Sequence, residues 1–196
     1  MGGGTPTVLD AVQLARLMEM IAGNFPVKDC DEFTVEAGRP DTITREKLEV
    51  LANAGVNRVS INPQTLNDEV LASIGRRHSA EQFFQAYHAA RAYPFTVNVD
   101  LIAGLEGETL SSFQDSLDRV IALEPENITV HSLTLKRASS LYQEKSLQIK
   151  DSSPVRDMVD YSQNVLSRQG YRPYYLYRQK NTIDSLENVG FARGDT

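Results

Sequence analysis

The sequence predicts an α/β fold in which helices pack outside a parallel sheet. Segments with the apolar spacing of helices alternate with short apolar segments of strand character, and the connections between them are short. At 196 residues the chain is long enough for one domain with a substantial core. Four or five strands are recognisable, which are too few for a closed eight-stranded barrel.

Composition and charge narrow the functional class. The net charge of -6 argues against a general nucleic-acid binder, because phosphate binding depends on clustered Lys and Arg. The sequence has no run of eighteen apolar residues and no signal segment, so we expect a cytoplasmic protein without a membrane span. Cys30 is the only cysteine, and we expect a small, partly buried side chain beside Phe33 and no metal ligand.

The first helix and strand follow a capping box. Asp10 and Gln13 have the spacing of reciprocal caps, and a strand is expected over residues 32–37. The helix between them has one apolar face, formed by Leu14, Leu17, Met18 and Ile21.

The same alternation continues through the middle of the chain. Thr44 can cap a helix that ends at Gly55, and a strand over 56–61 follows. A short helix over 68–74 ends at Gly75, and Ser79 opens a helix with a second capping box. We then expect a strand over 95–103, a helix around 113–121 and a strand over 128–135.

The alternation weakens after Lys136. Residues 137–152 have the composition of a loop, and a helix is expected to start at Ser153-Pro154 and to end at Gly170. A last strand over 171–177 is rich in tyrosines that we expect to pack. The sequence therefore predicts a core over residues 1–136 and a C-terminal extension over 137–196.

Polar residues lie where the predicted strands end, which is where parallel α/β sheets bind ligands. In chain order they are Glu36, Gln64, Asp100 and His131, with the loop Gly2–Thr5 in front and Arg76 after a short helix. Glycines allow close approach of a ligand, and an arginine fork pairs with a carboxylate. Glu36 could take an ammonium group, and Gln64 and Asp100 suit ribose hydroxyls. This chemistry fits a zwitterion attached to a ribose.

Each of these residues also has a structural interpretation. The terminal glycines are equally typical of a flexible tag remnant, and Glu36 and Gln64 taken alone are typical surface residues. His78 and His88 are expected on solvated helix surfaces, and His131 fits either interpretation. Asp100 favours the functional interpretation, because a carboxylate among Val97, Val99, Leu101 and Ile102 is costly to bury without a partner.

Eight segments together resemble the oxygen-independent coproporphyrinogen III oxidase family of radical S-adenosylmethionine (SAM) enzymes, and more narrowly its coproporphyrinogen dehydrogenase branch. In chain order they are GGGTPT, FTVEAGRPDTIT, AGVNRVSINPQT, IGRRHS, NVDLIAGLEGET, ITVHSLTLKRAS, YYLYRQKN and LENVGFARG. The resemblance implies a partial (β/α)6 barrel, a TIM-barrel-like fold, that lacks its first two strands. It leaves strand 32–37 as an exposed edge prone to self-association.

The resemblance also implies a cofactor and its ligands. Gly3, Gly4 and Thr5 would contact the methionyl end of SAM together with Glu36 and Arg76. Gln64 and Asp100 would bind the ribose, and Ile102 and His131 would lie near the adenine. Family members hold a [4Fe–4S] cluster with a CxxxCxxC motif ahead of the glycine loop, and this chain lacks that motif. Glu106 stands where the family usually has proline.

Three functions are consistent with the resemblance. The parent protein would be a haem-biosynthesis oxidoreductase that converts propionates of coproporphyrinogen III to vinyl groups by radical oxidative decarboxylation. Alternatively it would be a haem chaperone with the same SAM-binding core, although no histidine follows His131. The third possibility is that this chain by itself is a catalytically inert truncated barrel. We identify no residues for the chemical step.

Overall fold

The computed structural model describes residues 1–133, 153–177 and 188–194, and the chain divides into two compact units. Unit 1 contains Met1–Pro63 and Arg77–Val99, and unit 2 contains Gln64–Arg76 and Asp100–Thr196. The strands form a six-stranded sheet in the order β1-β2-β3-β4-β6-β5, and β3 belongs partly to each unit. The predicted domain boundary after residue 136 lies outside the described residues and stays a prediction.

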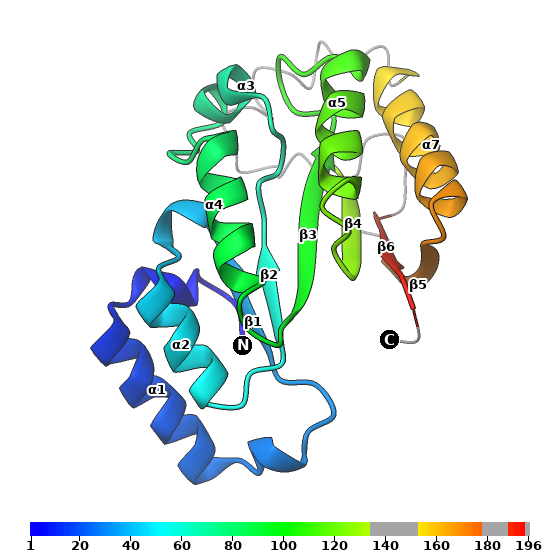
Figure 1. Cartoon of the computed structure of the whole chain (residues 1–196). Helices are drawn as coiled ribbons and strands as arrows, with labels where there is room; N and C mark the ends of the chain where they lie inside the picture. Colours follow the sequence, from blue (N-terminus) through cyan, green and yellow to red (C-terminus); the bar gives the residue numbers. More distant parts are fainter. Residues whose placement is uncertain (134–152, 178–187, 195–196) are drawn as a thin grey trace. The chain divides into compact units, whose positions relative to one another are not determined.

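Unit 1 is built from helices and parallel strands that alternate along the chain (Figure 1). Its elements are α1 (Ala11–Asn24), β1 (Thr34–Gly38), α2 (Arg45–Asn53), β2 (Arg58–Ile61), α4 (Ala80–Ala90) and the first half of β3 (Thr96–Ala103), with short 3-10 turns at Pro6–Val8, Val27–Asp29 and Pro40–Thr42. β1 pairs with β2, and β2 with β3, in parallel. α1 and α2 lie side by side.

The helices of unit 1 begin where their caps predict. The Asp10 carboxylate accepts from the backbone of Gln13 at 2.8 Å, and the Gln13 side chain accepts from the backbone of Asp10. Ser79 and Gln82 form the second predicted capping box at the start of α4. These reciprocal bonds satisfy N–H groups that have no partner within the helix. Local sequence therefore fixes both helix starts.

The three strands of unit 1 have one apolar and one polar face. Val35, Val59 and Val97 are register partners, and each is fully buried. The next row consists of Glu36, Ser60 and Asn98, whose side chains point to the opposite face because side chains alternate along a strand. The sheet therefore carries a row of polar side chains in which Glu36 is one member.

Unit 2 contains α3 (Asp68–Ser73), the second half of β3, α5 (Leu110–Ile121), β4 (Asn127–Ser132), α7 (Ser153–Arg168), β5 (Arg172–Tyr177) and β6 (Asn188–Ala192). β6 pairs antiparallel with both β4 and β5. α5 and α7 pack side by side (Figure 1). The described part of the fold is thus an α/β fold with a mostly parallel sheet, as predicted.

The C-terminal strands correct two expectations. β6 was not predicted, yet it lies between β4 and β5, and all its residues are buried. β5 is therefore an edge strand of the sheet, and each of its residues is exposed. The tyrosines of residues 171–177 were predicted to pack. This is wrong for Tyr174, Tyr175 and Tyr177 and correct only for Tyr171, which directly precedes β5 and is 2% exposed. The predicted loop over 137–152 lies outside the described residues.

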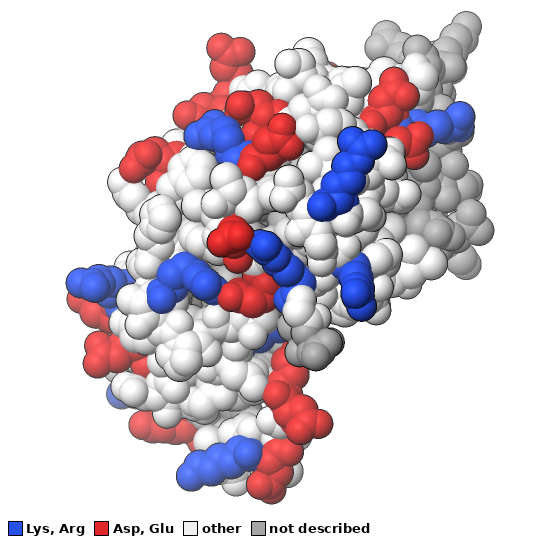
Figure 2. Space-filling model, turned by 45° about the vertical axis from the view of Figure 1, so that its right-hand side comes forward, with Lys and Arg blue, Asp and Glu red and all other residues white. Residues whose placement is uncertain are grey.

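Two expectations from composition concern the charge distribution and the lack of a membrane span. Basic and acidic side chains are interspersed on the face drawn in Figure 2, in keeping with the net charge of -6. Among the described residues, no helix is long and apolar enough to cross a membrane.

Candidate functional site

The glycine loop of unit 1 lies against Glu36. A Cβ atom on Gly2 would lie 2.6 Å from Oε2 of Glu36, so a larger residue at this position would displace the Glu36 carboxylate. Nothing lies within 4 Å of the corresponding positions on Gly3 and Gly4, so both have open space beside the backbone. Gly3 has a φ of +102°, a conformation that glycine adopts without strain. The loop therefore combines a close contact with a carboxylate and an accessible backbone.

Both ends of the glycine loop are anchored to β1. The backbone of Met1 donates to the carbonyl of Thr34 and accepts from the amide of Glu36 at 3.0 Å. After the loop, the Thr7 hydroxyl donates to the carbonyl of Ala37 at 2.7 Å. Thr5 lies near Gly38, where an added Cβ would be 3.5 Å from its hydroxyl oxygen. A flexible tag remnant would lack such contacts, so the loop is an ordered part of unit 1.

In unit 2, Gln64 lies between two other predicted site residues. Its backbone N–H donates to the carbonyl of Asp100 at 3.1 Å, and its carbonyl accepts from the amide of Ile102 at 2.9 Å. Gln64 is 7% exposed, so it is not the surface residue that its sequence alone would suggest. Its φ of +72° is a left-handed conformation that is uncommon outside glycine and often marks functional sites.

His131 belongs to the same group of residues in unit 2. Its Nε2 lies 3.7 Å from Oδ2 of Asp100, and the two side chains are 38% and 18% exposed, respectively. The imidazole is thus a polar neighbour for a carboxylate that interrupts an otherwise apolar strand. The structure therefore brings Gln64, Asp100, Ile102 and His131 together.

Arg76 lies at the end of α3 in the same unit. Its backbone N–H donates to the carbonyl of Leu71 at 2.9 Å and closes the helix after Gly75, which has a φ of +74°. The side chain is half-buried, whereas that of the adjacent Arg77 is exposed. The two arginines therefore differ in environment, although the sequence alone makes them look equivalent.

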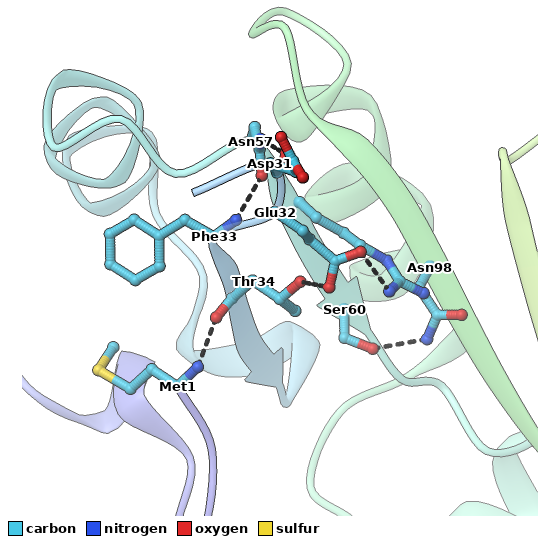
Figure 3. A network of polar contacts seen from close by, with 9 residues as sticks. Met1, Asp31, Glu32, Phe33, Thr34, Asn57, Ser60 and Asn98 are labelled. Atoms are coloured by element: carbon cyan, nitrogen blue, oxygen red, sulfur yellow. Dashed lines mark hydrogen bonds and ion pairs between the residues drawn. The ribbon is translucent and has the colours of Figure 1, made fainter. Parts of the chain in front are cut away.

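Three polar residues near the predicted site were not identified from the sequence. Asn98 donates to the Ser60 hydroxyl at 2.7 Å, and Ser60 donates in turn to the side chain of Asn62 at 3.1 Å. Figure 3 shows the Ser60–Asn98 pair beside the network that joins β1 to β2 at their start. The available signal was a polar residue in an otherwise apolar strand, the same signal that identified Asp100.

The network in Figure 3 links the start of β1 to β2 by side chains. Asn57 accepts from the amide of Phe33 at 2.8 Å, and Glu32 pairs with Arg58 at 3.1 Å. The hydrogen bond from Thr34 is the main cause that lowers the pKa of Glu32. The network supports the strand that carries Glu36.

Two histidines that look similar in sequence differ in the structure. His88 is exposed on α4, as expected. His78 is 3% exposed, and its Nε2 lies 3.1 Å from the carbonyl oxygen of Pro63, so the expectation of a solvated helix surface was wrong. The reason is a backbone acceptor fifteen residues earlier in the chain, which local sequence does not reveal.

The chain's thiol and carboxylates do not form a metal centre in the described residues. No group of three His, Cys, Asp or Glu residues is placed to hold a metal ion in that part of the chain. Cys30 is exposed, with its Sγ 3.7 Å from the carbonyl of Pro26, so the expectation of a partly buried side chain was wrong. It precedes β1 in a surface turn.

Sequence and structure comparisons agree on the family. The profile of the Radical SAM superfamily matches residues 1–120. The chain is 45% identical over 194 residues to the oxygen-independent coproporphyrinogen-III oxidase-like protein HemZ of Bacillus subtilis, and it is 35% identical to the heme chaperone HemW of the same organism. Each match covers 97% of this chain but only 39% of HemZ and 52% of HemW.

A solved structure extends the match to the fold. Coproporphyrinogen III oxidase (HemN) of Escherichia coli, described as a radical SAM enzyme, superposes with a TM-score of 0.80 at 28% identity. The superposition covers 100% of this chain and 43% of that protein, so the described fold corresponds to part of the HemN fold. The superfamily profile matches more than half of the residues of this chain, and the chain therefore belongs to the Radical SAM superfamily.

Proposed function

We propose that this chain forms part of the SAM-binding core of an oxygen-independent coproporphyrinogen III oxidase or dehydrogenase. The observation that carries the proposal is the placement of Gln64, whose backbone pairs with β3 between Asp100 and Ile102. This pairing gathers an amide, a carboxylate and an apolar side chain that suit a nucleoside: the polar groups suit its hydroxyls and the apolar side chain its base.

Each predicted residue has a role that its chemistry supports. Gly3, Gly4 and Thr5 present backbone and hydroxyl groups to the methionyl end of SAM, where Glu36 takes the ammonium and Arg76 the carboxylate. The Asp100 carboxylate accepts hydrogen bonds from the ribose hydroxyls, and the Gln64 amide accepts through its oxygen and donates through its nitrogen. Ile102 and His131 contact the adenine. In this proposal the chain's own residues bind and orient SAM.

The [4Fe–4S] cluster of this superfamily does not fit the residues of this chain. A site that leaves one iron open to SAM takes three cysteine thiolates, and Cys30 is the chain's only cysteine. It is exposed in a turn before β1 and has no second thiol to assist it. We therefore derive no radical step from this chain and expect it alone to bind SAM without cleaving it.

The coproporphyrinogen branch is favoured over the chaperone branch by sequence identity. Identity to HemZ is 45%, against 35% to HemW, over the same share of the chain. The parent enzyme would accordingly act on the propionate side chains of coproporphyrinogen III. The chaperone reading is the second candidate, because HemW also matches 97% of the chain.

Calorimetric titration of SAM into the purified chain tests the cofactor assignment. We expect binding that weakens by about tenfold or more in Arg76→Ala and Asp100→Ala, because each loses a charge-assisted hydrogen bond. Arg77→Ala and Asp115→Ala are matched controls, since both of these side chains are exposed. Equal losses in the controls, or no binding by a folded wild-type chain, would contradict the assignment.

A second titration separates the two branches. We expect coproporphyrinogen III, added in the absence of oxygen, to bind to the chain. We expect the Soret band of haem to stay unchanged when haem is mixed with the chain, because haem does not bind. A shifted Soret band with no binding of the porphyrinogen would favour the chaperone reading.

A further inference from the structure

The short segment after β2 holds Gln64 in an unfavourable backbone conformation. Its φ of +72° lies in the left-handed region, and two backbone hydrogen bonds join it to β3. A residue without glycine's freedom persists in this region only when its surroundings restrain it. The two bonds to β3 restrain Gln64 on one side, and the residues that follow it in the chain can restrain it further.

Thr65, Glu108 and Ser116 form a group of hydrogen-bonded side chains around the segment that follows Gln64, and we call them the Thr65 cluster. Thr65 and Ser116 are both 1% exposed, and their hydroxyl oxygens lie 3.3 Å apart. The Thr65 hydroxyl donates to Glu108 at 2.5 Å and accepts from the amide of Asn67 at 3.2 Å. The Ser116 hydroxyl accepts from the amide of Leu66 at 3.0 Å. Two consecutive backbone amides after Thr65 are thus satisfied by side chains.

Glu108 occupies an environment that does not suit an ionised carboxyl group. Burial raises its pKa to about 7, although hydrogen bonds from Thr65 and Ser112 act in the opposite direction. None of the roles proposed for binding SAM uses Glu108. Its contact with the buried Thr65 hydroxyl gives it a different role, which is to fix the side chain next to Gln64.

We propose that the Thr65 cluster is a positioning device that holds Gln64 in its left-handed conformation and so aims its amide at the ribose of SAM. The aim at SAM rests on the proposed function, whereas the restraint on the backbone does not. Thr65, Glu108 and Ser116 are positioning residues, because they act through Gln64 and not on the ligand.

Backbone hydrogen exchange tests the restraint without any ligand. In a ¹⁵N-labelled chain, we expect Ser116→Ala and Thr65→Val to speed exchange of the Gln64 and Ile102 amides by about tenfold or more, because local opening is easier. Thr65→Ser keeps the hydroxyl and should restore slow exchange. Ser111→Ala removes an exposed hydroxyl from the same helix and should change nothing.

The exchange pattern separates positioning from general stability. A merely structural role would speed exchange equally at Val59 in β2, whereas positioning leaves Val59 protected. Slow exchange of both the Gln64 and Ile102 amides in folded Ser116→Ala and Thr65→Val chains would overturn the proposal. Uniform acceleration across β2 and β3 would do the same.

SAM affinity then tests the aim of Gln64. If Gln64→Ala weakens SAM binding, we expect Thr65→Val to weaken it by about tenfold. The Gln64→Ala/Thr65→Val double variant should bind SAM about as weakly as Gln64→Ala alone, because both substitutions act through the Gln64 side chain. Loss in Gln64→Ala but not in Thr65→Val would overturn the aim at SAM. If the wild-type chain does not bind SAM, the proposed function fails and the aim with it, whereas the exchange result still decides the restraint.

Discussion

His78 lies buried where the chain leaves β2, and its ring contacts the carbonyl of Pro63. We expect His78→Ala to lower the free energy of unfolding by about 2–4 kcal/mol, because it leaves a cavity and a carbonyl without its donor. His88→Ala is the matched control, since His88 is exposed on α4 and should cost less than about 0.5 kcal/mol. Urea denaturation of both variants measures the difference. Equal effects would show that the contact with Pro63 contributes nothing.

A local signal identified some residues and misled at others. Asp100 is conspicuous because it interrupts an apolar strand, and its partner His131 is one strand away. The left-handed backbone of Gln64 could not be predicted, because the segment that follows it is hydrogen-bonded to Glu108 and Ser116, which lie more than forty positions away in the chain. Cys30 was misplaced because nearby Phe33 suggested burial. The ligand roles themselves stay predictions.

Tyr171 and Tyr175, directly before β5 and within it, are expected to contribute differently to stability. The Tyr171 hydroxyl donates to the carbonyl of Pro125 at 2.7 Å, and burial raises its pKa to about 12. We expect Tyr171→Phe to cost about 1 kcal/mol, the usual contribution of such a hydrogen bond. Tyr175→Ser should change stability by less than about 0.5 kcal/mol, because Tyr175 is 52% exposed. Denaturation midpoints distinguish the two. A larger loss in Tyr175→Ser would mean that this side chain is covered in solution.

The turn after β3 depends on a glycine that contacts α7. A Cβ on Gly104 would lie 2.8 Å from Cγ2 of Val155, and Gly104 has a φ of +91°. We expect Gly104→Ala to destabilise the chain by about 2–4 kcal/mol, through backbone strain and overpacking. Gly107→Ala, with a φ of +80° and open space around it, should show only the strain of about 1–2 kcal/mol.

A double variant separates the two causes at Gly104. Adding Val155→Ala should recover the overpacking part of the loss and leave the backbone strain. Simple additivity of the two losses would show that α7 does not pack against this turn in solution.

At the scale of elements, helices were predicted more reliably than strands. Their starts are set by neighbouring residues, as in the capping boxes at Asp10 and Ser79. β6 was missed because its five residues include a glycine and their partners in β4 lie about sixty positions earlier, as in Val130 with Val189. A short strand that contains a glycine and pairs on one side with a distant strand leaves little trace in a local pattern.

For the whole molecule, Glu108 makes stability depend on pH near neutrality. Its pKa is about 7 in the folded chain, against an ordinary value of 4.5, so between these pH values the folded state binds a proton that the unfolded state does not. Stability should therefore rise as pH falls from about 7 toward 4.5. Glu108→Gln should remove this rise and be more stable than wild type at about pH 8.

Urea denaturation between these pH values measures the effect, with Glu106→Gln as the exposed control in the same turn. A wild-type stability that falls steadily over the same window would contradict the expectation. The lowered pKa of Glu32 acts in a separate window, because its contribution is lost only as pH falls below its ordinary value.

The left-handed backbone at Gln64 has a consequence for mutational tolerance. Position 64 makes two separate demands, one on the backbone and one on the side chain. Glycine and asparagine meet the first, since both adopt positive φ readily. Only glutamine combines that conformation with an amide of the right reach. In a library of all substitutions at position 64, the order of the variants by resistance to proteolysis should therefore differ from their order by SAM binding. The difference between the two orders separates the requirement for folding from the requirement for ligand binding.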